Sequence, residues 1–136
     1  MPDAASAVVS VVIPVYKTAG YLPRCLDSVL AQTLREIEIV AIDDASPDHA
    51  AEILKAYAAK DSRIRIVTHE KNGGILAARL SGIAAATGDY LIFLDADDYL
   101  SLDCAKLALE KAESTGADMV HFEFEVLLPD GTSSEV

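Results

Sequence analysis

The stretch Tyr90-Leu91-Ile92-Phe93-Leu94-Asp95-Ala96-Asp97-Asp98 places an apolar run directly before three carboxylates. An apolar run without alternation is typical of a central strand, because both faces of such a strand are covered. Unpaired carboxylates are rare inside a buried strand. We therefore expect residues 90–94 to form a buried strand of a parallel sheet, with the three acids at its carboxyl end.

Asp95 and Asp97 are two residues apart in a segment that we expect to be extended, so their side chains should point the same way. Two carboxylates on one side suit a divalent cation that also keeps water and phosphate oxygens as ligands. A structural reading is open as well, since Asp is common in turns and at helix starts. Three acids together at one strand exit favour the metal site over that reading.

The chain has 136 residues, of which 51% are hydrophobic and 24% are charged, and its formal net charge is −11. This length suits one domain with its own core. The negative charge argues against nucleic acid and anionic membrane surfaces as partners, and a phosphorylated ligand would need a cation beside it. Cys25 and Cys104 are expected to be buried thiols in a reducing compartment. No stretch is long and apolar enough to span a membrane, and residues 1–7 resemble a disordered lead rather than a signal peptide.

Strand and helix patterns alternate along the chain. Ser46 and Ser101 are expected to cap helices, Gly88 and Gly116 to end them, and Leu76, Leu80 and Ile83 to form a buried stripe. The turn at residues 129–131 should start a hairpin whose return strand is cut off at residue 136. The expected strands are residues 8–16, 37–44, 63–68 (an edge strand), 90–94 and 118–128, and the expected helices are residues 20–32, 47–60, 74–87 and 102–115.

This alternation predicts a Rossmann-like, three-layer α/β/α protein with a mainly parallel sheet. Right-handed crossovers bring the carboxyl ends of the strands to one edge, where open sheets of this kind bind ligands. At that edge the order places Pro14 with Tyr16, Asp43 with Asp44, and the acids after residue 94. An aromatic ring, hydrogen-bonding carboxylates and a metal-binding pair could hold a base, a ribose and a pyrophosphate with its cation. Purely structural roles remain as alternatives: packing at a strand end for Pro14 and Tyr16, and turn formation for Asp43 and Asp44.

Other nucleotide sites fit less well. A dinucleotide-binding unit needs G-x-G-x-x-G after the first strand, where this chain has Tyr16-Lys17-Thr18-Ala19-Gly20. The P-loop motif is absent, and a receiver domain would place its acid pair after the first strand rather than the second. Arg79 could be a solvated arginine, or its guanidinium could point at a phosphate or an aspartate of the crevice.

These residues resemble the large family of inverting glycosyltransferases with the GT-A fold, family two, over residues 10–103. Each motif alone is weak, but the ordered set is highly specific. The motifs are Ser10-Val11-Val12-Ile13-Pro14-Val15-Tyr16, Gln32-Thr33, Ile42-Asp43-Asp44-Ala45-Ser46-Pro47-Asp48, Asn72-Gly73-Gly74 with Ala78-Arg79, and Gly88-Asp89-Tyr90 followed by Phe93-Leu94-Asp95-Ala96-Asp97-Asp98.

The resemblance implies a site for a nucleotide-diphospho-sugar, by family default a UDP-sugar, with Mn²⁺ or Mg²⁺ as cofactor. Asp97 and Asp95 would bind the metal ion. The reaction would pass the sugar to an acceptor hydroxyl with inversion, in the synthesis of cell-surface polysaccharide or another glycan. The implied nucleotide-binding residues are Pro14, Val15, Tyr16, Asp43, Asp44, Arg79, Asp95 and Ala96.

The resemblance also sets limits. Lys17 stands where the family usually has Asn. The family's catalytic base and acceptor-binding elements lie in a later segment, so we assign no base and expect it beyond residue 136. Residues 1–136 would then be the donor-binding portion of a single GT-A domain.

The implied acceptor is a saccharide or a lipid-linked group. The implied location is cytoplasmic, and peripheral association with the cytoplasmic membrane face stays open for a full enzyme. Two alternatives also remain: a non-catalytic α/β interaction module whose acids only cap helices, and another enzyme that acts on nucleotide sugars.

Overall fold

The computed structural model describes residues 6–135, so most of the predicted lead over residues 1–7 lies outside the described residues. Strands and helices alternate through the first four strands, as predicted. The elements are β1 (Val9–Val15), α1 (Leu22–Leu30), β2 (Ile37–Asp43), α2 (Ala50–Lys60), β3 (Ile64–Thr68), α3 (Ile75–Ala85), β4 (Tyr90–Phe93), α4 (Cys104–Thr115), β5 (Glu125–Leu127) and β6 (Ser133–Glu135).

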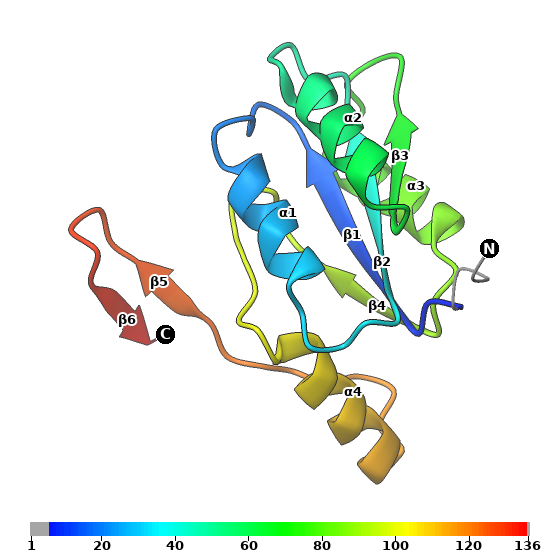
Figure 1. Ribbon diagram of the computed structural model, residues 1–136, viewed down its shortest axis with the longest axis vertical. Helices are drawn as coiled ribbons and strands as arrows, with labels where there is room; N and C mark the ends of the chain where they lie inside the picture. Colours follow the sequence, from blue (N-terminus) through cyan, green and yellow to red (C-terminus); the bar gives the residue numbers. More distant parts are fainter. Residues whose placement is uncertain (1–5, 136) are drawn as a thin grey trace.

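The first four strands form a parallel sheet in the order β3-β2-β1-β4. Helices α1 and α2 cover one face of this sheet and α3 covers the other (Figure 1). This arrangement confirms the predicted three-layer α/β/α fold and the predicted edge position of β3. Every residue of β2 is buried, and β1 is buried except at Pro14, which is partly exposed.

Helix α3 lies against the sheet through small residues. Its buried residues are Ala78 and Gly82, and a Cβ atom on Gly82 would stand only 2.2 Å from Cγ1 of Val12. The predicted buried stripe of Leu76, Leu80 and Ile83 is wrong, since these side chains are 45–69% exposed. The helix is turned so that its smallest side chains meet the strands, because a close approach excludes bulky ones.

The prediction that residues 90–94 form a central strand covered on both faces is also wrong. β4 is the edge of the described sheet, hydrogen-bonded to β1, and Leu91 and Phe93 are 39% and 46% exposed. Helix α3 packs mainly over β1 and β2, so it leaves the adjoining face of β4 uncovered. An apolar run therefore did not distinguish an edge strand from a central one.

The predicted strand over residues 118–128 is reduced to β5, which pairs with β6 in a hairpin apart from the main sheet (Figure 1). Phe122, Phe124 and Val126 are exposed, so the predicted core face is wrong. The turn is as predicted: Gly131 has a φ of +86°, and its N–H donates to the Leu128 carbonyl. The return strand Ser133–Glu135 lies within the described residues.

The predicted helix boundaries need correction at three points. Helix α2 begins at Ala50 and α4 at Cys104, so neither Ser46 nor Ser101 is an N-cap. The side chain of Ser46 instead accepts the Lys17 N–H. Gly88 is needed for close packing rather than for a left-handed turn, because a Cβ atom there would lie 2.7 Å from Oγ of Ser10. Gly116 does end α4 with a φ of +72°, as predicted.

Within residues 6–135, no helix has both the length and the apolar character that crossing a bilayer requires. Cys25 is buried and Cys104 is half-buried, and both are free thiols. Burial raises the pKa of the Cys25 thiol to about 12. These thiols match the expectation of small buried groups rather than reactive ones.

The close approach of α3 generates a first prediction. Gly82→Ala should lower the free energy of unfolding by about 1–3 kcal/mol through overpacking against Val12, although alanine is by itself the better helix residue. The matched control is Gly20→Ala, since nothing lies within 4 Å of a Cβ atom at Gly20. Urea unfolding of both variants measures the difference, and a stability gain in Gly82→Ala would contradict the packing described.

Candidate functional site

A hollow of about 340 Å³ opens at the carboxyl edge of the sheet. Its walls come from the ends of β1 and β2, from the loop before α3, from α3 itself and from the segment after β4. The structure thus brings residues that are far apart in the chain into one site. The lining residues are Pro14, Val15, Tyr16, Thr18, Asp44, Asn72, Gly74, Ile75, Ala78, Asp95, Ala96 and Asp97.

The exit of β1 presents an aromatic ring to this hollow. Tyr16 is 40% exposed, and Nζ of Lys17 lies 5.3 Å from the centroid of its ring. The chain turns sharply here, because Lys17 has a φ of +55° and its N–H donates to Oγ of Ser46 at 2.8 Å. Asn tolerates such a φ better than Lys does, which gives a physical reason for the Asn that the resemblance expects at this position.

Asp44 is the buried acid of the hollow. Its Oδ1 accepts hydrogen bonds from Nδ1 of His69 at 2.7 Å and from the Gly73 N–H at 2.9 Å, and its Oδ2 accepts the Gly74 N–H at 2.9 Å. Burial acts to raise the pKa of Asp44, but the bonds from Gly73, His69 and Gly74 outweigh it and hold the pKa below the usual range. The carboxylate is therefore charged at neutral pH and anchors the loop at residues 72–74.

Asp43 has a different place. It is buried, and its Oδ1 accepts the Ser46 N–H at 3.0 Å, which closes the turn that contains Ala45 at a φ of +58°. It does not line the hollow. In this structure Asp43 serves the turn that positions its neighbour, in line with the turn chemistry that the sequence left open.

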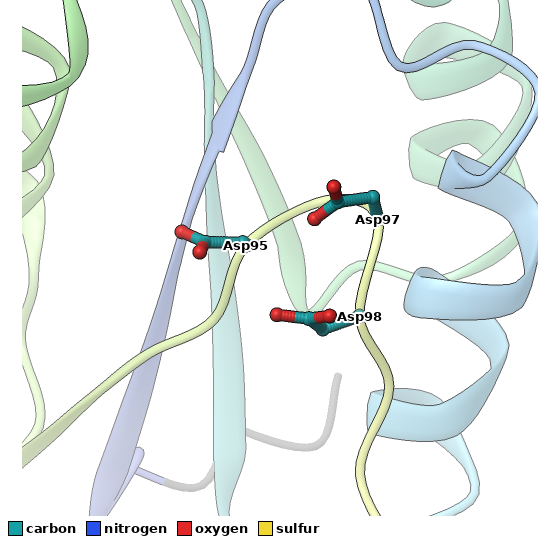
Figure 2. A group of neighbouring side chains, drawn as sticks. All are labelled: Asp95, Asp97 and Asp98. Carbon is teal, nitrogen blue, oxygen red and sulfur yellow. The ribbon is translucent and has the colours of Figure 1, made fainter. Parts of the chain in front are cut away.

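Three carboxylates stand together after β4. Figure 2 shows the side chains of Asp95, Asp97 and Asp98 as neighbours on the short segment after β4. One oxygen from each lies within 4.8 Å of the others. Burial raises the pKa of Asp98, and the charges of Asp97 and then Asp95 raise it further. Carboxylate oxygens are the ligands that Mg²⁺ and Mn²⁺ prefer, so the donor set fits such an ion.

Arg79 reaches the acids from α3. Its Nη2 lies 3.5 Å from Oδ1 of Asp95, and its guanidinium carbon lies 5.8 Å from the centroid of the Phe93 ring. Arg79 does not itself line the hollow, but it contacts an acid that does. The pair is partly exposed, so its own contribution to stability is small.

Two buried polar atoms near this site have no hydrogen-bond partner among the described residues, Oγ1 of Thr18 and Nε of Arg79. Such atoms are uncommon in folded proteins and call for an explanation. Thr18 was missed from the sequence, where its only signal was a position two residues past Tyr16. His69 was missed as well, because a single histidine outside any motif gives no signal of a binding site.

The acid segment is held in place by α1. The Cys25 thiol donates to the Asp95 carbonyl at 3.7 Å, and Oγ of Ser28 accepts the Leu100 N–H at 3.1 Å. Buried Gln32 donates to the Ser101 carbonyl at 2.6 Å and accepts the Ala105 N–H at 2.9 Å. These bonds fix the segment that carries Asp95, Asp97 and Asp98 against the body of the domain.

Comparison with known proteins gives the family. A family model described as glycosyl transferase family 2 matches residues 10–132. The chain belongs to this family. It is 43% identical over 112 residues to EpsJ of Bacillus subtilis, an uncharacterized glycosyltransferase, which covers 82% of this chain and 32% of EpsJ. It is 38% identical over 103 residues to the chondroitin synthase of Pasteurella multocida, which covers 76% of this chain and 11% of the synthase.

Among solved structures, TarS (residues 1–349) of S. aureus in complex with UDP-GlcNAc is similar with a TM-score of 0.76 and 29% identity, over 81% of this chain and 32% of the TarS chain. The likeness supports the GT-A fold that the resemblance implied. This member of family 2 spans about a third of the length of EpsJ and about a tenth of the length of the chondroitin synthase.

The depressed pKa of Asp44 generates a second prediction. A carboxyl group whose pKa is lower in the folded state stabilises the fold above its unfolded pKa of about 3.9, and this contribution is lost as the pH falls through the folded value. Asp44→Asn should therefore cost about 1–3 kcal/mol at pH 7, because an amide cannot accept all three hydrogen bonds.

The difference in unfolding free energy between the two proteins should shrink as the pH falls below the unfolded pKa of about 3.9. Urea unfolding of wild type and variant at pH 7 and pH 3 measures this difference. The pH effects of the other acidic residues cancel in the comparison, because both proteins carry those residues. A difference that is the same at both pH values would contradict the assigned bonds.

Proposed function

We propose that this chain is the donor site of a glycosyltransferase and binds a nucleotide-diphospho-sugar, with a UDP-sugar as the first candidate. The observation that carries the proposal is the shared hollow, which joins the ring of Tyr16, the loop anchored by Asp44 and the acids Asp95 and Asp97. Membership in family 2 supports the class of reaction. The TarS complex with UDP-GlcNAc supports the choice of a uridine donor.

The proposed contacts follow from the side chains available. The ring of Tyr16 offers a face on which a base can stack, and Pro14 with Val15 forms the apolar wall beside it. Asp44 would accept from a base or ribose through the lone pairs that its three protein donors leave free. Thr18 lines the hollow, and its Oγ1 has no partner among the described residues, so it offers a polar contact to ribose or phosphate oxygens.

Asp95, Asp97 and Asp98 would hold the Mn²⁺ or Mg²⁺ ion at this site. When bound, the ion would act as a Lewis acid that takes up negative charge on the departing diphosphate. Ala96, which is buried between the acids, keeps that short segment packed on the core. Arg79 would add positive charge next to Asp95, on the side where the phosphates would lie.

Transfer with inversion needs a general base that takes the proton of the acceptor hydroxyl. No such base is assigned among residues 6–135, and the resemblance expects one in a later segment. We propose a saccharide or lipid-linked acceptor and a role in polysaccharide or glycan synthesis at the cytoplasmic side. The relation to a chondroitin synthase supports polymer synthesis as one such role.

Calorimetric titration with UDP tests the donor site. Binding should occur with Mn²⁺ and should fall at least tenfold, equivalent to about 1.4 kcal/mol, when a chelator removes the metal. Asp97→Ala should cause a similar loss in the presence of Mn²⁺. The control is Asp89→Ala, which removes an exposed acid beside the opposite end of the same strand.

A parallel titration with GDP decides between nucleotides. If neither nucleotide gives heat with or without metal, the proposal fails and a non-catalytic interaction module becomes the better account. If the Asp89 variant loses binding as strongly as the Asp97 variant, the assignment of the metal to the site after β4 fails.

A further inference from the structure

His69 links three elements around the hollow without lining it. It follows the last residue of β3, and its backbone N–H donates to the Asp43 carbonyl at 2.9 Å. Its Nδ1 lies 2.7 Å from Oδ1 of Asp44, and its Nε2 lies 2.7 Å from Oγ of Ser81 on α3. The ring thus spans from the end of β2 to α3.

Asp44, which His69 contacts, in turn holds the loop at residues 72–74 through hydrogen bonds. Its two carboxylate oxygens accept the N–H groups of Gly73 and Gly74, and its carbonyl accepts Nδ2 of Asn72 at 3.3 Å. Asn72 and Gly74 line the hollow, and Gly74 is the N-cap residue of α3. The orientation of one carboxylate therefore sets where this wall of the hollow stands.

The carboxylate needs a third donor to hold that orientation. The Asp44 side chain is only 3% exposed, so water cannot replace a lost partner without rearrangement. A buried charge that loses a hydrogen bond retains its desolvation cost. The hydrogen bond to Ser81 fixes the orientation of the His69 ring, so Nδ1 of the ring stays directed at Asp44.

The loop has little freedom to compensate. A Cβ atom on Gly73 would stand 3.0 Å from Cβ of Ala77, 3.7 Å from Oδ1 of Asp44 and 3.9 Å from Nδ1 of His69. Gly74 has a φ of +88°, a conformation that favours glycine. The loop is thus fitted closely to Asp44 and His69, and a shift of the carboxylate would move it.

We propose that His69 is a positioning residue of the donor site: by holding the Asp44 carboxylate, it places the loop at residues 72–74 for a nucleoside diphosphate. This inference rests on the proposed function for its ligand, but the placement of the loop can be measured without any ligand. The bond that matters is the one from Nδ1 to Asp44. The bond to Ser81 serves to orient the ring.

Two substitutions separate these bonds. The amide nitrogen of Asn stands the same number of bonds from Cβ as Nδ1 of histidine, and the amide nitrogen of Gln corresponds to Nε2. His69→Asn should therefore keep the hydrogen bond to Asp44 and lose the one to Ser81. His69→Gln should keep the hydrogen bond to Ser81 and lose the one to Asp44. We expect UDP affinity with Mn²⁺ to stay within about twofold in His69→Asn and to fall about tenfold in His69→Gln, as for a lost hydrogen bond to a charged group.

Amide hydrogen exchange of Gly73 and Gly74, followed by NMR without ligand, supplies the second measurement. Exchange should be faster in His69→Gln and unchanged in His69→Asn. Ser81→Ala serves if His69→Gln does not fold, because alanine favours the helix. It should speed exchange at both glycines and weaken UDP binding about twofold to threefold. The control is His121→Gln, which changes an exposed histidine outside the hollow.

The outcomes are distinct. Equal UDP affinity and equal glycine exchange in the Asn and Gln variants would overturn the positioning role, as would equal losses in both. If wild type does not bind UDP, the proposed function fails for this nucleotide, while the glycine exchange rates still decide whether His69 places the loop.

Discussion

The buried carboxylate of Asp44 is the interaction on which the site depends. It stands at the end of β2 with almost no access to water, so its charge must be satisfied by the protein. The available donors are the N–H groups ahead of α3 and the ring that follows β3. One acid therefore joins β2, β3 and α3 at the edge where open α/β sheets bind ligands. The hydrogen bonds that satisfy the buried charge of Asp44 therefore also determine the shape of the hollow.

The packing of α3 against the sheet also helps to place the loop at residues 72–74. Ala78 and Gly82 let the helix approach β1 and β2 closely, and this approach brings Gly74 to the carboxylate of Asp44. The larger side chains of α3 then point away from the sheet. The face over β4 stays open, which leaves Phe93 free to contact the guanidinium of Arg79. The close packing of α3 on β1 and β2 thus leaves the adjoining face of β4 exposed.

The sequence predicted the layers, the parallel sheet and the convergence of Tyr16, Asp44 and Asp97, because these follow from element order and crossover handedness. It could not predict which face of α3 is buried, since the decisive signal was the absence of side chains at Gly82. It also could not show whether an apolar strand such as β4 has neighbours on both sides. The roles of His69 and Thr18 depend on contacts across the sheet edge, and single residues give no periodic signal for such contacts.

The acids after β4 pose an electrostatic problem that the proposed function answers. Three carboxylates share a small space in a chain with a net charge of −11, and the charges of Asp97 and Asp95 add to burial in raising the pKa of Asp98. Arg79 contacts one of them and is partly exposed, so it offsets little of the repulsion. A diphosphate alone would add to that repulsion. A divalent cation would relieve both, since it attracts the carboxylates and the phosphates together. On the proposed function, metal and donor should therefore bind cooperatively, because each lowers the electrostatic cost that the other meets at this edge of the sheet.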